Sequence, residues 1–243
     1  MNTNDPAVCV VVPVRNEAGN IAPLVAEIAK ALDGQWRFEV VYVNDGSSDG
    51  TEAELKRLMG LHPWLRRVRH KQSCGQSAAV RSGVAAARAP VVVTIDGDGQ
   101  NDPAFIPALV RALEAGSPRV GLIAGQRTGR KSGGFKKLQS RVANAVRGAV
   151  LRDGTRDSGC GLKAFRRDLF LALPYFDGLH RFLPALVRRE GYDIGYVDVV
   201  DRPRGTGVSN YGMWDRLWVG LLDLAGVWWL IRRKKRIPEI SED

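Results

Sequence analysis

Residues 91–100 read VVVTIDGDGQ, an apolar β-branched run that ends directly on two aspartates separated by one glycine. Such a run predicts a buried strand whose carboxyl end carries Asp96 and Asp98. Two carboxylates at a strand end, with glycines that let the backbone turn, are typical ligands of a hard divalent cation and leave room for phosphate oxygens. An EF-hand loop is excluded, because Asn101 stands where that loop needs glycine and Pro107 where it needs glutamate.

Similar apolar runs recur along the first 127 residues, with helix-like segments between them. Near-continuous apolar strands that alternate with helices predict an α/β fold of Rossmann-like character, with a mostly parallel sheet flanked by helices. Ligands bind such sheets outside the carboxyl ends of the strands. The expected strands are 8–14, 38–43, 65–68, 91–95 and 120–124, and the expected helices are 21–32, 51–59, 77–87 and 104–115.

Two more polar clusters follow expected strands. Arg15 to Glu17 come after the first strand, and NDGSSDGT, residues 44–51, comes after the second. Asp45 is placed to accept hydrogen bonds from a base or a ribose, while Ser48 or Asp49 caps the next helix. Neither GxGxxG after the first strand nor GxxxxGK[ST] anywhere is present, which disfavours a dinucleotide fold and a P-loop. We therefore expect a nucleotide to be held by another route.

The net charge of +10 lies entirely after residue 100. Positions 1–100 hold 11 basic and 11 acidic residues, and nine Lys/Arg without any acid lie between residues 115 and 152. This second half is expected to form a helix over 134–150, an aspartate-rich turn over 153–161 and a strand over 193–201. A neutral first half followed by a cationic half suggests two tasks.

Three of these motifs, taken together, resemble those of a known family. PVRNE (13–17), NDGSSDGT (44–51) and DGDGQNDP (96–103) resemble, in this order and at strand ends, the donor-side motifs of family 2 glycosyltransferases with the GT-A fold. Four downstream strings are similar to those of the polyprenyl-phosphate sugar transferases, including the dolichyl-phosphate mannosyltransferases. They are GQR (125–127), SRVAN (140–144), DSGCGLKAFRR (157–167) and RPRGTGVSNYG (202–212).

This resemblance implies a role for each matching residue. Those expected to line the base and ribose pocket are Pro13, Arg15, Glu17 and Asp45. Those expected to bind Mg²⁺ or Mn²⁺ at the diphosphate are Asp96, Asp98 and Gln100. Those expected to cradle the acceptor phosphate are Arg127, Ser140 and Arg141. Asp157 matches an acid close to the sugar, and Arg202 and Arg204 match residues that meet the donor diphosphate. Relatives commonly read SKY where this chain has residues 209–211, SNY, so a phosphate-binding lysine is missing.

The implied activity is an inverting, metal-dependent transfer of a hexose, with mannose from GDP-mannose as the first choice, onto polyprenyl (dolichyl or undecaprenyl) phosphate. A phosphate monoester is already ionised at neutral pH, so it needs cations rather than a strong general base. The basic second half fits that need. The QxxRW string of processive synthases does not occur in the sequence.

Two alternatives remain open from the residues. One keeps the fold but uses a UDP-sugar and a sugar-hydroxyl acceptor in cell-envelope polysaccharide synthesis, with Asp157 as the base. The other is a basic nucleic-acid-binding protein, prompted by a pI of about 9.9. That second alternative requires a basic stripe with interleaved aromatic residues or a known motif, and the sequence contains neither. We therefore expect no nucleic-acid partner.

The C-terminal segment LWVGLLDLAGVWWLI, residues 217–231, is expected to be an amphipathic helix. Fifteen residues of helix cover only about 22 Å, short of the ~30 Å hydrocarbon core, and Asp223 lies near the middle. With its tryptophans and the following RRKKR, the segment is expected to lie on an anionic membrane surface, the alternative being a buried core helix. The expected units are residues 1–212, with a donor half (1–127) and an acceptor half (128–212), and a C-terminal helix and tail (213–243).

The N-terminus has no basic stretch ahead of its apolar run and does not read as a signal peptide. The three cysteines have no paired spacing, which predicts neither a disulfide framework nor a zinc site. The protein is therefore expected on the cytosolic face of the membrane, and a separate membrane-protein partner is left open.

Overall fold

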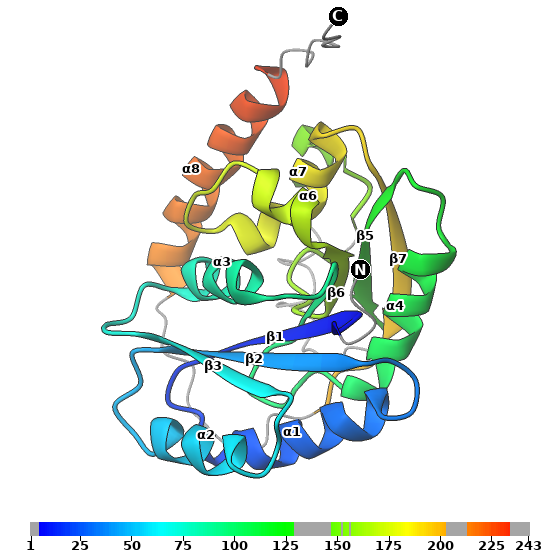
Figure 1. Ribbon diagram of the computed structural model, residues 1–243. Helices are drawn as coiled ribbons and strands as arrows, with labels where there is room; N and C mark the ends of the chain where they lie inside the picture. The colour runs from blue at the N-terminus through cyan, green and yellow to red at the C-terminus, as the bar shows by residue number, and fades with distance from the viewer. Residues whose placement is uncertain (1–4, 129–146, 152, 156, 203–212, 234–243) are drawn as a thin grey trace, which may run out of the picture.

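The computed structural model describes residues 5–128, 147–151, 153–155, 157–202 and 213–233, with the side chains of 213–219 excepted. Its centre is a seven-stranded sheet in the order β3-β2-β1-β4-β6-β5-β7 (Figure 1). The strands are β1 Val8–Val14, β2 Phe38–Asp45, β3 Leu65–His70, β4 Val91–Thr94, β5 Val120–Arg127, β6 Lys163–Arg166 and β7 Asp193–Val199.

Helices cover both faces of this sheet (Figure 1). The helices are α1 Ala18–Leu32, α2 Thr51–Met59, α3 Gln76–Ala86, α4 Ile106–Ala115, α6 Arg167–Ala172, α7 Leu179–Arg189 and α8 Met213–Arg232, with a 3-10 turn at Pro103–Phe105. Helices α1, α2 and α4 pack on one face, and α3, α6 and α7 on the other. This two-sided cover confirms the predicted α/β architecture.

The two-sided burial follows from the alternation of side chains along a strand. In β1, Val8, Val10 and Val12 enter the core under α1 and α4, whereas Cys9 and Val11 enter the core under α3. Each face therefore needs apolar residues, and the strand reads as a continuous apolar run. Cys9 is fully buried in this way and, like Cys160, is a free thiol.

The strands and helices predicted in the first 127 residues are all present, with ends shifted by at most a few residues. The structure adds β6, α6 and α7 between residues 163 and 189, which the sequence pattern did not predict. Strand β6 has only four residues and pairs antiparallel with both β4 and β5. The helix expected over 134–150 lies mostly outside the described residues, and only residues 147–151 are seen as helix.

The direction of β6 determines which residues lie beside the carboxyl ends of β1, β2 and β4, the edge of the sheet where ligands are expected. Strands β1, β2 and β4 are parallel, so their carboxyl ends lie together. Because β6 runs the opposite way, its first residue, Lys163, pairs with Thr94 at the end of β4. Residues that precede β6 are therefore delivered to the same edge as the aspartates that follow β4.

The C-terminal helix α8 lies against α7. Val227 is fully buried there, and Leu224, Leu230 and Ile231 pack partly on the same core. Other apolar side chains of α8 face outward, namely Leu221, Leu222, Trp228 and Trp229. Across the described part of the chain, no helix has the length and hydropathy needed to cross a membrane.

Candidate functional site

Asp96 lies two residues beyond the end of β4, at the edge of the sheet formed by the carboxyl ends of β1, β2 and β4. Its backbone N–H donates to Asn101 Oδ1 (3.3 Å), and its Oδ1 accepts from Gln76 Nε2 (2.9 Å) at the start of α3. Burial, together with the charge of Asp98, raises the pKa of Asp96 to about 6. The structure thus holds two carboxylates close together, one of them partly removed from water.

The turn after Asp96 brings three oxygen-bearing side chains into one loop. Gln100 N donates to Asp98 Oδ1 (3.1 Å), which closes the loop through Gly99. The carboxylates of Asp96 and Asp98 and the amide oxygen of Gln100 form the hard-oxygen set that Mg²⁺ or Mn²⁺ prefers. The mutual repulsion that raises the pKa of Asp96 is relieved by a cation, so these residues fit a divalent metal.

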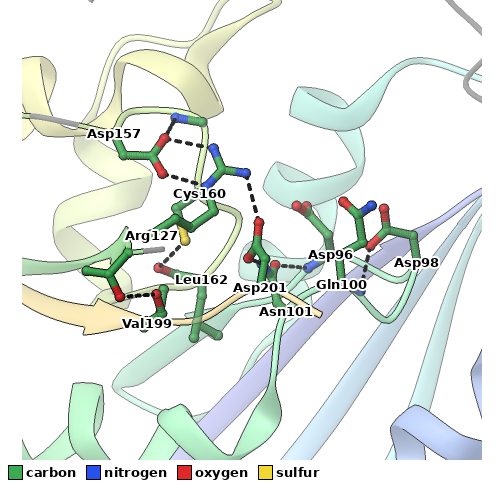
Figure 2. Close-up of polar contacts among 12 residues, drawn as sticks. Asp96, Asp98, Gln100, Asn101, Arg127, Asp157, Cys160, Leu162, Val199 and Asp201 are labelled. Atoms are coloured by element: carbon green, nitrogen blue, oxygen red, sulfur yellow. Dashed lines mark hydrogen bonds and ion pairs between the residues drawn. The ribbon is translucent and has the colours of Figure 1, made fainter. Parts of the chain in front are cut away.

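Arg127, at the end of β5, lies between two further carboxylates (Figure 2). Its Nε and Nη2 donate to the two oxygens of Asp157 (2.5 and 2.7 Å), and its Nη1 donates to Asp201 Oδ2 (3.3 Å). Asp201 Oδ1 accepts in turn from Asn101 Nδ2 (3.2 Å). This network, Arg127 with Asp157, Asp201 and Asn101, ties β5 and the segment before β6 to the loop that carries Asp96.

The ion pair also sets the ionisation of Asp157. Burial opposes the charged form, but the hydrogen bonds from Arg127 and its positive charge outweigh burial, so the pKa of Asp157 is lowered. Both oxygens of Asp157 are occupied by Arg127, and Oδ1 also accepts from Gly159 N (3.1 Å). A carboxylate held in this way is a weak proton acceptor.

Asp45 is buried at the end of β2 and organises the neighbouring loop. Its oxygens accept from Ser73 Oγ (2.8 Å), Cys74 N (2.8 Å) and Gly75 N (3.0 Å), and Oδ1 lies 2.7 Å from His70 Nδ1. These bonds outweigh the opposing effect of burial and lower the pKa of Asp45. The loop of residues 73–75, which Asp45 binds, leads directly into Gln76, and Gln76 contacts Asp96. Asp45 therefore acts on the site indirectly, by fixing this loop.

Asp45, His70 and Cys74 also bring their ligand atoms within 4.8 Å of one another. A metal there has to compete with existing hydrogen bonds, because Asp45 is already saturated and His70 Nε2 lies 2.9 Å from Ser82 Oγ. We therefore describe these residues as a hydrogen-bonded cluster, and the oxygen set around Asp96 fits a divalent cation better.

The segment after β1 is fastened to the segment after β2. Asn16 Oδ1 accepts from Ser48 N (2.8 Å), Asn16 N donates to Ser47 Oγ (3.0 Å), and Glu17 N donates to Thr51 Oγ1 (3.0 Å). Arg15 is exposed beside them. The first two sequence motifs therefore form one continuous rim, as their positions at strand ends predicted.

Arg202 follows Asp201, and its guanidinium is engaged by two carboxylates. It pairs with Glu27 of α1 (2.8 Å) and with Asp102 (2.5 Å), while its backbone N donates to Gln100 O (2.8 Å). Arg202 therefore connects the loop of residues 96–102 to α1. Three other residues with expected roles, Ser140, Arg141 and Arg204, lie outside the described residues.

A cavity of about 240 Å³ opens beside Asp96. Polar side chains in its lining come from α3, β6 and α7, namely Gln76, Lys163, His180 and Arg181, while Pro13 closes one side. Lys163 is only 4% exposed. The structure therefore places Pro13 and Asp96 in the lining of one cavity and adds basic residues that sequence reasoning missed.

Two signals in the sequence could have identified some of the missed residues. Asp201 is the last residue of the strand expected over 193–201, and Asn101 directly follows Gln100. Lys163 lies within the string DSGCGLKAFRR (157–167), but neither Lys163 nor His180 gave a signal of its own, because their segments were not predicted as strand or helix. Their approach to Asp96 depends on the reversed direction of β6 and on the packing of α7 against α3.

Gly161 provides a direct test of this geometry. A Cβ at position 161 lies 2.2 Å from Asp96 Oδ2 and 2.4 Å from its Cγ, so Gly161→Ala displaces the carboxylate. A misplacement of about 1 Å in a reacting group costs about 100-fold in rate, and we expect a loss of that size in turnover. Gly60→Ala is the control, because the nearest atom to its added Cβ is 3.4 Å away. Equal activity of the two variants contradicts the placement of Asp96.

Comparison with known proteins gives a family match and several relatives. The model of the glycosyl transferase family 2 matches residues 9–173. The chain is 36% identical over 96% of its length to a dodecaprenyl-phosphate galacturonate synthase of Rhizobium johnstonii, covering 71% of that protein. It is 30% identical over 87% of its length to an undecaprenyl-phosphate 4-deoxy-4-formamido-L-arabinose transferase of Aeromonas hydrophila, covering 65% of it. The chain thus spans about two thirds of the length of these relatives.

Solved structures show the same fold. The glucosyl-3-phosphoglycerate synthase of Mycobacterium tuberculosis, in complex with Mn²⁺, UDP and glucosyl-3-phosphoglycerate, matches with a TM-score of 0.69 at 21% identity. The match covers 93% of this chain and 80% of that protein. The likeness confirms the predicted GT-A architecture.

Proposed function

The chain belongs to the family 2 glycosyltransferases, and from this premise we propose that it transfers a sugar from a nucleotide-sugar donor to a polyprenyl phosphate. The relatives described above, which are named for transfer to dodecaprenyl and undecaprenyl phosphate, support the acceptor class. The observation that carries the proposal is the state of Asp157, whose two oxygens are both bonded to Arg127.

Asp157 bears on the acceptor because a sugar hydroxyl must lose a proton during attack, whereas a phosphate monoester is already ionised. The pKa of Asp157 is lowered, which leaves it poorly suited to take that proton. Three of the five Arg127 N–H groups bond to Asp157 and Asp201, so two remain for an anionic acceptor. This arrangement supports a phosphate nucleophile.

In the proposed reaction a phosphate oxygen attacks the anomeric carbon. The bond between that carbon and the donor diphosphate breaks, the configuration inverts, and the nucleoside diphosphate leaves with the bonding electron pair. Asp96, Asp98 and Gln100 would hold a divalent cation, which would offset the charge that develops on the diphosphate. Gln76 and Asn101 fix Asp96 for this task, and the rim formed by Pro13, Arg15, Glu17 and the loop held by Asp45 lies where the nucleotide is proposed to bind.

The sugar is a finer question than the reaction class. Mannose from GDP-mannose is the expectation that follows from the resemblance, while the relatives named above carry galacturonate and a formamido-arabinose in their names. The decisive assay incubates the protein with Mn²⁺, a short polyprenyl phosphate and, in turn, labelled GDP-mannose, UDP-glucose and UDP-galacturonate. A lipid-linked product from any one of them supports the proposal, and no product from any nucleotide sugar refutes it.

The acceptor class can be tested at Asp157. If Asp157 is the base for a hydroxyl acceptor, Asp157→Asn should lower kcat at least about 100-fold. With a phosphate acceptor we expect a loss below about 10-fold, because no proton has to be removed and Asn keeps one hydrogen-bond acceptor for Arg127. A pH profile of kcat for both proteins is the second measurement. Loss of the acid-side limb in the variant alone would favour the hydroxyl acceptor, because a general base stops working when it is protonated at low pH.

We also propose that α8 binds the membrane surface where the lipid acceptor resides. Trp228 and Trp229 are 41% and 52% exposed, and Arg232 and Arg233 lie over their rings at 4.0 and 5.8 Å. Aromatic rings flanked by cations are typical of interfacial helices on anionic lipid. In this proposal residues 1–212 transfer the sugar, and residues 213–243 hold the protein at the cytosolic face, with or without a membrane-protein partner.

Point substitutions test α8 better than deletion, because Val227 is part of the core and its removal exposes that core. We expect Trp228→Ser with Trp229→Ser to lower binding to anionic vesicles at least about 10-fold in a flotation assay. Tyr175→Ser is the matched control, since Tyr175 is an exposed aromatic residue outside α8, at 47% exposure. Unchanged flotation of the double variant contradicts a membrane role for α8.

A further inference from the structure

Lys163 is buried and, among the described residues, forms no ion pair within 4 Å, although the charges of Asp96 and Asp157 act on it from further away. It is 4% exposed at the start of β6, and its Nζ donates to the backbone carbonyl of Cys160. An ammonium has three N–H donors, so two remain after this bond. Lys163 lines the cavity beside Asp96. A buried cation normally finds an anionic partner, and its position directs the remaining donors to whatever fills the cavity.

His180 adds a second donor to the same cavity. Ser77 Oγ accepts from Gly178 N (3.0 Å) and lies 2.7 Å from His180 Nδ1. Because the backbone N–H group of Gly178 is the donor to Ser77 Oγ, the hydroxyl hydrogen of Ser77 is directed to Nδ1, which leaves the proton of the neutral ring on Nε2. Burial keeps the ring neutral by lowering the pKa of His180 to about 3. His180 lines the cavity, so it is an uncharged donor there.

The cavity lining is therefore rich in donors and cations. Arg181 also lines the cavity, and among the described residues Asp96 is the one carboxylate in the lining, beside the hydroxyl groups of Thr94 and Ser158. Gln76 donates an amide N–H to Asp96, and Asp96 is proposed to face the metal. The hydroxyl groups of a neutral hexose are bound by acceptors as well as donors, whereas a carboxylate is bound by donors alone.

We propose that this cavity holds the sugar ring of the donor and that Lys163, assisted by His180, binds a carboxylate on that ring, so that the donor is a nucleotide-linked hexuronic acid. The inference rests on the proposed function and deepens it from sugar transfer to a class of sugar. Lys163 is then a specificity-determining residue. The cavity adjoins Asp96, which is where the sugar of a donor held through its diphosphate would lie.

The test compares two donors that differ in one group. UDP-galacturonate and UDP-galactose share the ring and the nucleotide. UDP-galacturonate carries a carboxylate where UDP-galactose carries a hydroxymethyl group. The full chain is assayed with Mn²⁺ and a short polyprenyl phosphate, and kcat/KM is measured for each donor. We expect the wild-type protein to prefer UDP-galacturonate, and Lys163→Met to lower kcat/KM for it about 100-fold while changing that for UDP-galactose less than about 5-fold.

Two further variants separate specificity from structure. Lys163→Arg keeps the charge and should retain part of the preference. Lys56→Met is the matched control, because the Lys56 side chain is 64% exposed on α2, remote from the cavity, and it should leave both values unchanged. A general loss of structure lowers kcat/KM for both donors together, so the ratio of the two kcat/KM values reports on the carboxylate contact alone.

Each outcome distinguishes the inference from the proposed function. An equal loss for both donors in Lys163→Met overturns the inference, because the ammonium then serves Asp96 or the diphosphate. A wild-type preference for UDP-galactose or GDP-mannose over UDP-galacturonate also overturns it, while the proposed function stands. No lipid-linked product from any donor overturns both. If Lys163→Met fails to fold, the wild-type ratio and Lys163→Arg still decide.

Discussion

Replacing Asp98 with alanine is expected to lower kcat at least about 1000-fold while leaving the fold intact. Asp98 lies in the turn after β4, where its Oδ1 accepts a hydrogen bond from Gln100 N. Its removal takes away half of the carboxylate pair proposed to hold the divalent cation. Loss of several kcal/mol of charge stabilisation at the leaving diphosphate corresponds to about three orders of magnitude in rate.

The measurement is turnover at saturating Mn²⁺, paired with a thermal melt followed by circular dichroism. Asp33→Ala is the control, since Asp33 is an exposed aspartate beyond the end of α1. An Asp98→Ala protein with activity within about 10-fold of the wild type removes Asp98 from the metal site. A melting temperature lowered by many degrees would instead show that the turn contributes to stability.

Arg127→Gln is expected to impair both stability and activity. The Arg127 side chain is 13% exposed, and those of Asp157 and Asp201 are 20% exposed. Substitution leaves two partly buried carboxylates facing each other without their cation. Removing one partner from a fully buried pair costs about 3–5 kcal/mol, and for this partly exposed group we expect about 2 kcal/mol in the free energy of unfolding. We also expect kcat to fall at least about 100-fold, because Asp201 and Asn101 connect Arg127 to the Asp96 loop.

The pH dependence of unfolding provides an independent check. Because the pKa of Asp157 is lowered in the folded protein, its stabilising contribution is complete above its unfolded value of about 4 and is lost as the pH falls through the folded value. Arg127→Gln should therefore weaken the loss of stability below pH 4. Arg57→Gln, which breaks the exposed pair with Glu54, is the control. Identical unfolding profiles for Arg127→Gln and the wild type contradict the role of the ion pair.

Much of the fold could be predicted from the sequence, and the reason lies in the strands of the first half. β1 and β2 are buried on both faces, so each appears as a near-continuous apolar run in the sequence. The motifs that follow β2 and β4 then place Asp45 and Asp96 at one edge of the sheet. The predicted helix Thr51–Met59 agrees with the observed one at both ends.

The second half was harder to predict for physical reasons. Strand β6 has four residues, too few for periodicity to show, and it pairs against the direction of its neighbours. The pairing of Arg127 with Asp157 joins positions 30 residues apart, which depends on sheet order rather than on local pattern. Lysine side chains are usually exposed, so the residue type alone predicts a solvent-exposed Lys163, whereas the structure buries it.

The sheet order also has a consequence for synthesis of the protein. β6, residues 163–166, lies between β4 and β5, both of which leave the ribosome earlier. At about 5–20 residues per second, β4 waits several seconds for its inner neighbour. During that interval the nascent chain has three unpaired, apolar strand edges, one on β4 and both on β5, because β7 also follows later. Such edges are the surfaces most prone to pair with other chains. Co-translational folding of this protein is therefore expected to depend on chaperone protection of β4 and β5 until β6 emerges.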